Sequence, residues 1–398
     1  MIDAAPLDNP DTFVAGLPLE LLAQLREEDP VHWLPHRRGG GRYVVTSYQY
    51  VREFNRDWQQ FSSSQLAVSG GEGEHRGQGA ITLLEFDPPD HTALRLLVNR
   101  GFTPRAIRRL EDSAHRIAGE LVDGFLASGG GDAAEMLAAQ LPLHVTGEML
   151  GIPMSDRADI LSWTNTTIGA FDPEMCPTMD DARAAMANFA AYGQAHIARR
   201  KAEPGDDVFS SLVHAEYEGR RLTDEELGGW WQLLVTGSTE TTRNLLSSGL
   251  MLLLDHPAQA AALAADDSLL DEAIDEMLRV VTPVMHHQRR VTTPMEHESG
   301  VSFEPGQIVD LWMTAANRDP EVFDHPDAFD IHRDASGQLS LGSGGPHYCL
   351  GANLARTEAR AYFSALAPHL HRLERSGPEA RLRTTHFNSL KHLPVAVK

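Results

Sequence analysis

The chain of 398 residues has a hydrophobic content of 42% and a formal net charge of −22 at pH 7. This length and composition permit a large buried core, in one large domain or in two. The negative charge argues against nucleic acid or an anionic membrane surface as a partner, because binding to phosphate requires a positive field.

The N-terminal residues 1–18 contain neither the basic nor the apolar region of a secretory signal. The chain also has no run of about 18 apolar residues, which a membrane-spanning helix requires. We therefore expect a cytoplasmic protein without a membrane-inserted segment.

Apolar residues recur at helical spacing through most of the first 280 residues, for example at 11–28, 185–200 and 269–281. The pattern predicts a mainly helical architecture. The glycine-rich segment 68–79 is typical of a mobile loop rather than a domain linker, and no internal repeat is visible. We expect a single domain that spans residues 1–398.

A local basic run interrupts the acidic total. Five arginines lie close together, at Arg95, Arg100, Arg105, Arg108 and Arg109. The run has two interpretations: a solvated face of a helix, or a positive patch for an acidic partner.

The clearest single helix is predicted to begin at Thr223 and to end before Pro257. Thr223 and Glu226 fit a capping box, in which the hydroxyl and the carboxylate bond to opposite backbone amides of the first turn. The helix would have about thirty residues and a length of roughly 45 Å, enough to cross a whole domain.

The centre of this predicted helix is unusually polar, with the sequence TGSTETT at 236–242. Hydroxyl side chains compete for backbone carbonyls, and a charged Glu240 needs a partner or water. Two interpretations stay open. The segment is either a polar patch on an exposed face or a local opening of the helix that admits a small molecule and passes protons.

Residues 290–312 change the pattern, because β-branched residues and a Pro305–Gly306 turn predict short strands there. Further along, the segment LGSGGPHYCLG at 341–351 places Cys349 behind a run of glycines. Glycines let the backbone approach a sulfur closely, and the helix predicted to follow would point its positive end at it. We interpret Cys349 as a thiolate ligand, whereas Cys176 has no such surroundings.

This cysteine segment resembles the corresponding loop of the cytochrome P450 superfamily of haem-thiolate monooxygenases, with Leu341 where the family usually has phenylalanine. The segment 236–242 resembles the central helix motif of the same family, with Ser238 in place of a common glycine. The resemblance covers nearly the whole chain. It implies a single helix-rich domain with small β-sheets, in which haem b lies between the long helix and the cysteine loop.

By the same resemblance, Cys349 is the axial ligand of the haem iron, and Gly351 follows it in the cofactor-binding loop. Glu240 and Thr241 are the acid and the alcohol of oxygen activation. The expected haem propionate ligands are His91, Arg95, Arg290 and His347, although Arg289 is an alternative to Arg290. A structural triad is expected of Glu276, Arg279 and Arg333.

The resemblance further implies hydroxylation or another oxidation of a hydrophobic small molecule, such as a terpenoid, steroid, fatty acid or polyketide-type intermediate. Dioxygen and two electrons from NAD(P)H would be used, the electrons passing through a ferredoxin or flavodoxin with its reductase. Alternatives are a peroxide-driven or non-oxygenating haem-thiolate enzyme, and a haem sensor or carrier. The expected substrate pocket consists of Leu83, Leu84, Leu233, Gly237, Val284, Met285 and Phe387.

Overall fold

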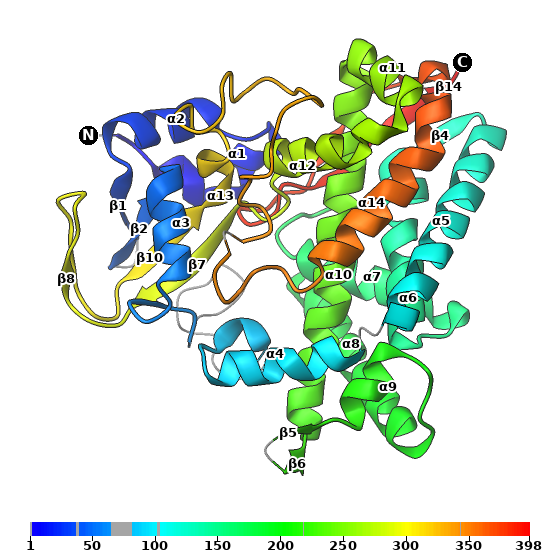
Figure 1. The fold of residues 1–398 in the computed structure, drawn as a ribbon, viewed down its shortest axis with the longest axis horizontal. Helices are drawn as coiled ribbons and strands as arrows, with labels where there is room; N and C mark the ends of the chain where they lie inside the picture. The colour runs from blue at the N-terminus through cyan, green and yellow to red at the C-terminus, as the bar shows by residue number, and fades with distance from the viewer. Residues whose placement is uncertain (1, 37–39, 65–81, 102–103, 218, 343) are drawn as a thin grey trace.

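The computed structural model describes residues 2–36, 40–64, 82–101, 104–217, 219–342 and 344–398. A strand-rich part near the N-terminus lies beside a larger helical part (Figure 1). The glycine-rich loop expected at 68–79 lies outside the described residues. None of the helices in these ranges is long and apolar enough to cross a lipid bilayer.

Helices make up most of the chain. They are α1 (Pro10–Val14), α2 (Leu19–Glu28), α3 (Tyr48–Arg56), α4 (Asp90–Gly101), α5 (Pro104–Ala127), α6 (Gln140–Leu150), α7 (Arg157–Ile168), α8 (Met179–Ala202), α9 (Val208–Val213), α10 (Asp224–Asp255), α11 (Pro257–Ala265), α12 (Leu270–Val281), α13 (Met313–Ala316) and α14 (Ala352–Leu366). The strands are β1 (Val31–Pro35), β2 (Gly41–Val45), β3 (Phe61–Ser62), β4 (Gly130–Asp132), β5 (Glu216–Tyr217), β6 (Arg220–Arg221), β7 (His286–Val291), β8 (Met295–Glu296), β9 (Ser302–Phe303), β10 (Ile308–Trp312), β11 (Leu373–Arg375), β12 (Ala380–Arg381), β13 (Leu390–His392) and β14 (Pro394–Val397).

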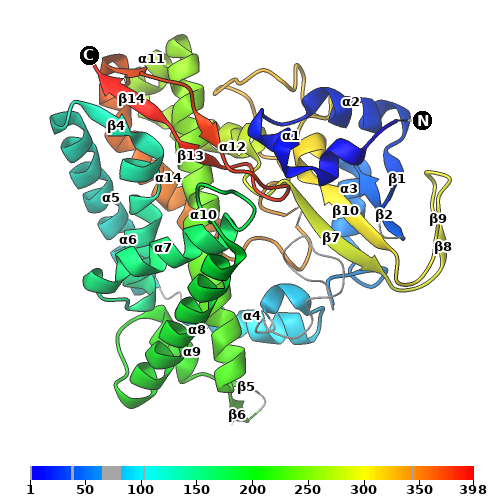
Figure 2. The same ribbon diagram turned by 180° about the vertical axis from the view of Figure 1, so that it is seen from behind.

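Helix α10 runs through the middle of the helical part and is seen from opposite sides in Figures 1 and 2. Thr223 caps its first turn, and both halves of the predicted capping box with Glu226 are present. Helix α14, which follows the cysteine loop, packs against α10. A Cβ added to Gly249 would lie 2.7 Å from a ring atom of Phe363, so glycine lets the two helices approach closely.

Of the two interpretations of residues 236–242, the local opening of the helix does not occur, because α10 stays α-helical throughout. The hydroxyls bond back onto the helix instead: Thr236 donates to the carbonyl of Gln232 at 2.7 Å, and Thr241 to that of Gly237 at 2.8 Å. These bonds satisfy the hydroxyls without removing any backbone hydrogen bond from the helix.

The main sheet has the strand order β1-β2-β10-β7-β3. Strand β10 runs parallel to β2 and antiparallel to β7. The strands predicted between residues 290 and 312 are present, and Gly306 turns the chain before β10 with a φ of +90°. This φ lies in the left-handed region, which only glycine adopts without strain.

The C-terminal strands return the chain to the middle of the molecule. Strand β14 pairs with β11 and β4, and β13 pairs with β12. An isolated antiparallel bridge joins Val284 to Phe387, and β13 contacts α10. The last turn before β13 therefore lies next to the centre of the long helix.

Candidate active site

Cys349 lies in a turn just before α14, whose N-cap is Gly351. Its amide donates a hydrogen bond to the carbonyl of Leu341 at 2.7 Å, and Leu341 itself is 9% exposed and packs in the core around α10 and α14. Gly345 is needed in this loop, because a Cβ there would lie 2.4 Å from the carbonyl oxygen of Asn55. The loop thus holds the sulfur in a fixed position.

Burial raises the pKa of the Cys349 thiol. The amide of Gly351 and the positive charges of Arg95 and Arg356 lower it, but burial is the largest influence. The amide of Gly351 and the two arginines thus favour the thiolate, whereas burial opposes it. A metal ion bound to the sulfur would reverse the balance, because coordination deprotonates a thiol outright.

A polar cluster lies near the sulfur. His91 and Arg95 come from α4, Arg289 comes from β7, and His347 comes from the cysteine loop. The ring centroids of His91 and His347 are 4.3 Å apart, and Nη2 of Arg289 donates to Asn55 Oδ1 at 2.6 Å. Arg95 interacts electrostatically with Cys349.

The charges in this cluster do not balance. Burial and the positive charge of Arg95 lower the pKa of His91 to about 4, and burial and Arg289 lower that of His347 to about 2. Burial lowers the pKa of Arg289 only to about 10. At neutral pH the histidines are therefore uncharged and the arginines are positive, which suits the binding of an anion.

Arg290 does not belong to this cluster. Side chains alternate between the two faces of a strand, so Arg289 and Arg290 point to opposite sides of β7. Arg289 is 6% exposed and acts electrostatically on both His91 and His347, whereas Arg290 donates to the carbonyl of Gly306 at 3.4 Å. The geometry favours the alternative, Arg289, over Arg290 as the second arginine of the cluster.

One face of α10 is left open. Among the described residues, a Cβ added to Gly237 would meet only Leu233 Cδ1, at 3.9 Å. Thr241 lies one turn after Gly237 and is half-buried on the same face. The hydroxyl of Ser238 points away from this face, because it bonds to the hydroxyl of Thr146 on α6 at 2.7 Å.

Glu240 faces the other way from this open face and is 4% exposed. Its Oε1 accepts a hydrogen bond from the hydroxyl of Ser389 at 2.9 Å, and its Oε2 lies 3.7 Å from Nη1 of Arg243. Glu240 and Thr241 are adjacent in the sequence but lie on different sides of α10, because an α-helix turns by about 100° per residue.

These residues fit haem b. Its two carboxylates would meet Arg95, Arg289 and the two histidines, and among the described residues Nε2 of His347 is buried without a hydrogen-bond partner. Its flat ring needs space next to α10, where Gly237 supplies no side chain, and Cys349 offers one sulfur. No cluster of three or more metal-ligating side chains occurs within the described ranges.

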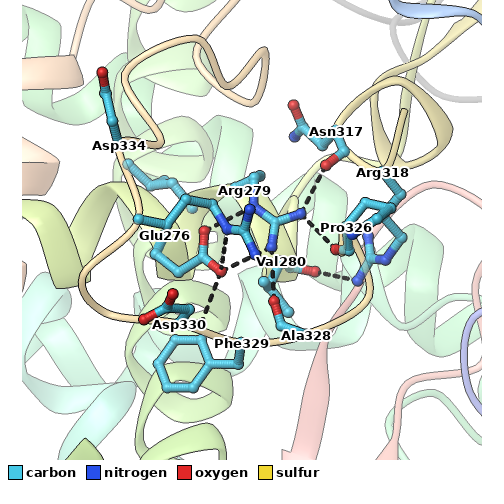
Figure 3. A network of polar contacts seen from close by, with 12 residues as sticks. Glu276, Arg279, Val280, Asn317, Arg318, Pro326, Ala328, Phe329, Asp330 and Asp334 are labelled. Atoms are coloured by element: carbon cyan, nitrogen blue, oxygen red, sulfur yellow. Dashed lines mark hydrogen bonds and ion pairs between the residues drawn. The ribbon is translucent and has the colours of Figure 1, made fainter. Parts of the chain in front are cut away.

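The expected triad is brought together, and Figure 3 shows its Glu276 and Arg279. Arg279 Nε and Nη2 each donate to the carboxylate of Glu276 at 2.7 Å, and both residues are fully buried. Arg333 Nε donates to the same carboxylate at 3.3 Å. The other nitrogen bonds of Arg279 go to the carbonyls of Asn317, Pro326 and Ala328, so the triad fastens the chain after α13 to α12.

The residues expected to line the substrate pocket differ in their burial. Val284 and Phe387 are paired side by side and half-buried, and Leu233 is half-buried beside Gly237. Leu83 is 6% exposed and Leu84 is 37% exposed. Met285 was also expected in the pocket, but it is fully buried in a separate core with Phe13 and Trp312.

Sequence reasoning missed the partners of Glu240. Ser389 is 149 residues away in the chain, and Asn165, which accepts a hydrogen bond from Arg243 at 3.1 Å, is on α7. No local pattern pointed to either of them. The second cysteine, Cys176, is buried, and its sulfur bonds to the carbonyl of Thr178 at 3.0 Å.

The sequence matches the family model described as Cytochrome P450 over residues 170–374. It is 34% identical to a steroid C26-monooxygenase of Rhodococcus jostii, over 98% of this chain and 84% of that protein. It is 33% identical to a methyl-branched lipid omega-hydroxylase of Mycobacterium bovis, over 94% of this chain and 89% of that protein.

Solved structures agree with these matches. A Mycobacterium marinum cytochrome P450 in complex with pseudoionone has a TM-score of 0.91 and 30% identity, covering 100% of this chain and 98% of its own. A Bacillus megaterium cytochrome P450 in complex with testosterone has a TM-score of 0.82 and 30% identity, covering 96% and 99%. With the cysteine loop, the open face of α10 and the buried triad in place, the chain belongs to the cytochrome P450 family of haem-thiolate monooxygenases.

Proposed function

We propose that this P450 monooxygenase inserts one oxygen atom from dioxygen into a C–H bond of a medium-to-large hydrophobic small molecule, such as a steroid, terpenoid, fatty acid or polyketide-type intermediate. One observation carries the proposal: the sulfur of Cys349, just before a helix that packs against α10, lies beside a cluster of arginines and uncharged histidines. The relatives that oxidise steroids and branched lipids support the substrate class.

Haem b would be held by the Cys349 sulfur and, at its carboxylates, by Arg95, Arg289, His91 and His347. When bound, haem with a thiolate ligand supplies the activation of dioxygen and the cleavage of its O–O bond. The protein excludes water from the sulfur by the loop 341–351 and balances the two carboxylates with buried positive charge.

Thr241 and Glu240 would hold and deliver protons. The Thr241 hydroxyl lies on the open face and bonds to the carbonyl of Gly237, and the Glu240 carboxylate is buried behind it. A hydroxyl both donates and accepts, so Thr241 can pass a proton to a group on the open face and regain one. Thr241→Ala is expected to lower the yield of product per NAD(P)H consumed; an unchanged yield would refute this role.

The substrate would lie against an apolar wall next to α10. Val284 and Phe387 form one part of it through their bridge, and Leu233 and Leu83 form another. Burial of apolar surface is the main source of binding free energy for such a molecule, at about 25 cal/mol per Å². A few polar anchors would orient it.

Electrons would come from NAD(P)H through a ferredoxin or flavodoxin with its reductase. Two arginines of α14 are paired with acidic residues of α12: Arg356 with Asp275 at 2.7 Å, and Arg360 with Asp271. Arg108 is exposed on α5, which packs against α14. Arg108→Glu is expected to slow reduction by an acidic ferredoxin at low salt and to have little effect at high salt, because surface charges are screened.

The experiment that tests the function is the spectrum of the reduced, carbon-monoxide-bound protein, compared with Cys349→Ser. The thiolate-type absorption should be present in the natural protein and absent in the variant. Turnover with a surrogate ferredoxin and reductase then separates a monooxygenase from a peroxide-driven or non-oxygenating enzyme and from a haem sensor or carrier. Absence of the thiolate-type absorption in the natural protein would overturn the proposal.

A further inference from the structure

The carboxylate of Glu240 is held from the side that faces away from the open face of α10. Ser389 lies immediately before β13, and its hydroxyl donates to Oε1 of Glu240 at 2.9 Å. Both side chains are buried, at 4% exposure for Glu240 and 3% for Ser389. A hydrogen bond between a buried hydroxyl and a carboxylate is strong, because little water competes for either group.

The backbone around Ser389 is held firmly in place. The Ser389 carbonyl accepts from the amide of Leu382 at 3.0 Å, and the amide of Asn388 donates to the carbonyl of Pro283 at 3.0 Å. Arg243, one turn after Glu240 on α10, donates from Nη2 to the carbonyl of Lys391 at 3.3 Å. The same helix thus binds this segment both through its own acid and through an arginine, so the hydroxyl has a fixed direction.

A narrow crevice separates this pair from the surface. Glu240, Arg243, Ser389 and Lys391 line it together with Asn165, Ile168, Met175 and Leu382, and it has no room for a water molecule. On its outer side, Nζ of Lys391 bonds to Glu174 at 2.6 Å and lies 3.0 Å from Asp172. The buried pair of Glu240 and Ser389 and the less buried side chain of Lys391 therefore line the same crevice.

We infer that Ser389 is a positioning residue for proton delivery: its hydroxyl holds the carboxyl group of Glu240 in a fixed orientation. The inference deepens the proposed function and rests on the role given there to Glu240 and Thr241.

The test compares Ser389→Ala, which removes the hydroxyl, with Ser389→Thr, which keeps it. Ser302→Ala is a matched control, because Ser302 also donates to a carboxylate, that of Glu296 at 2.6 Å, but on the exposed hairpin β8–β9. We expect Ser389→Ala to lower the product formed per NAD(P)H roughly threefold to tenfold, a part of the total contribution of acid–base catalysis. Ser389→Thr and Ser302→Ala should stay within about twofold of the natural protein.

A second measurement does not depend on turnover. The infrared carboxylate bands of Glu240, assigned by their loss in Glu240→Gln, should shift in Ser389→Ala and return toward their natural position in Ser389→Thr. The thermal unfolding temperature of each variant, measured beside the spectra, reports any loss of stability separately. Unshifted bands would therefore refute the inference, whatever happens to stability.

Thr241→Ala, measured beside these variants, distinguishes a failure of the inference about Ser389 from a failure of the proposed function. If Thr241→Ala lowers the product yield and Ser389→Ala does not, the inference about Ser389 is wrong and the proposed function stands. If neither variant changes the yield, the proton-delivery role of the acid and the alcohol is itself wrong, and the inference fails with it.

Discussion

Replacement of Arg279 by lysine should be among the most destabilising conservative changes in this protein. The guanidinium donates five hydrogen bonds within a site that water does not reach: two to Glu276 and one each to the carbonyls of Asn317, Pro326 and Ala328. Figure 3 shows these bonds converging from several directions on one planar group.

The magnitude follows from counting donors. A lysine ammonium has three protons, so at least two of the five acceptors lose their partner. Each buried acceptor left unsatisfied costs about 1–3 kcal/mol, and disruption of a fully buried ion pair costs about 3–5 kcal/mol. We expect a loss of about 3–5 kcal/mol, which is a large part of the total of about 5–15 kcal/mol typical of a folded protein.

The assay is urea unfolding followed by circular dichroism, with the carbon monoxide spectrum as a measure of retained haem. Arg375→Lys is the matched control, because Arg375 pairs with Asp255 at 3.1 Å at the surface and the change should cost less than about 1 kcal/mol. A loss below about 1 kcal/mol for Arg279→Lys would refute the view that this network holds the chain after α13 against α12.

Two further predictions concern the helices. Gly249→Ala would place a Cβ 2.7 Å from a ring atom of Phe363, and this overpacking should lower the free energy of unfolding by about 1–3 kcal/mol. Gly119→Ala is the control in the same unfolding assay: none of the described residues lies within 4 Å of a Cβ there, so the change should be neutral or stabilising. Hydrogen bonds from Arg220 lower the pKa of Glu226 from 4.5 to about 2, so the capping box contributes stability above pH 4.5 that is lost as the pH falls toward 2. Glu226→Gln should remove that part of the acid dependence, worth about 1 kcal/mol; an identical acid titration of stability in the variant would contradict it.

Features determined by short stretches of sequence could be predicted from the chain alone. The start and the end of α10 follow from Thr223, Glu226 and Pro257, because capping and helix termination involve only neighbouring residues. Glu276 and Arg279 meet because residues three apart share one face of a helix. The importance of Cys349 was visible because the glycines and the following helix surround it in the sequence itself.

Other features depended on how distant segments are aligned. Arg289 rather than Arg290 faces the histidines because the register of β7 against β10 decides which side of the strand points inward, and the sequence of β7 fits either choice. Met285 is buried in a separate core. Likewise, only the tertiary structure shows that positive charges on α14 are paired with acidic residues of α12, as Arg356 is with Asp275.

Helix α10 shows most clearly what the sequence determined and what only the tertiary structure decided. The chain alone indicated that Glu240 needs a partner, because a charge in a buried helix is costly without one. Only the tertiary structure supplied Ser389 as that partner, since a hydrogen bond across 149 residues depends on where β13 returns to the helix and leaves no periodic trace in the sequence. Local hydrogen bonding and hydrophobic periodicity thus determined the elements, whereas long-range packing decided which side chains meet at the site.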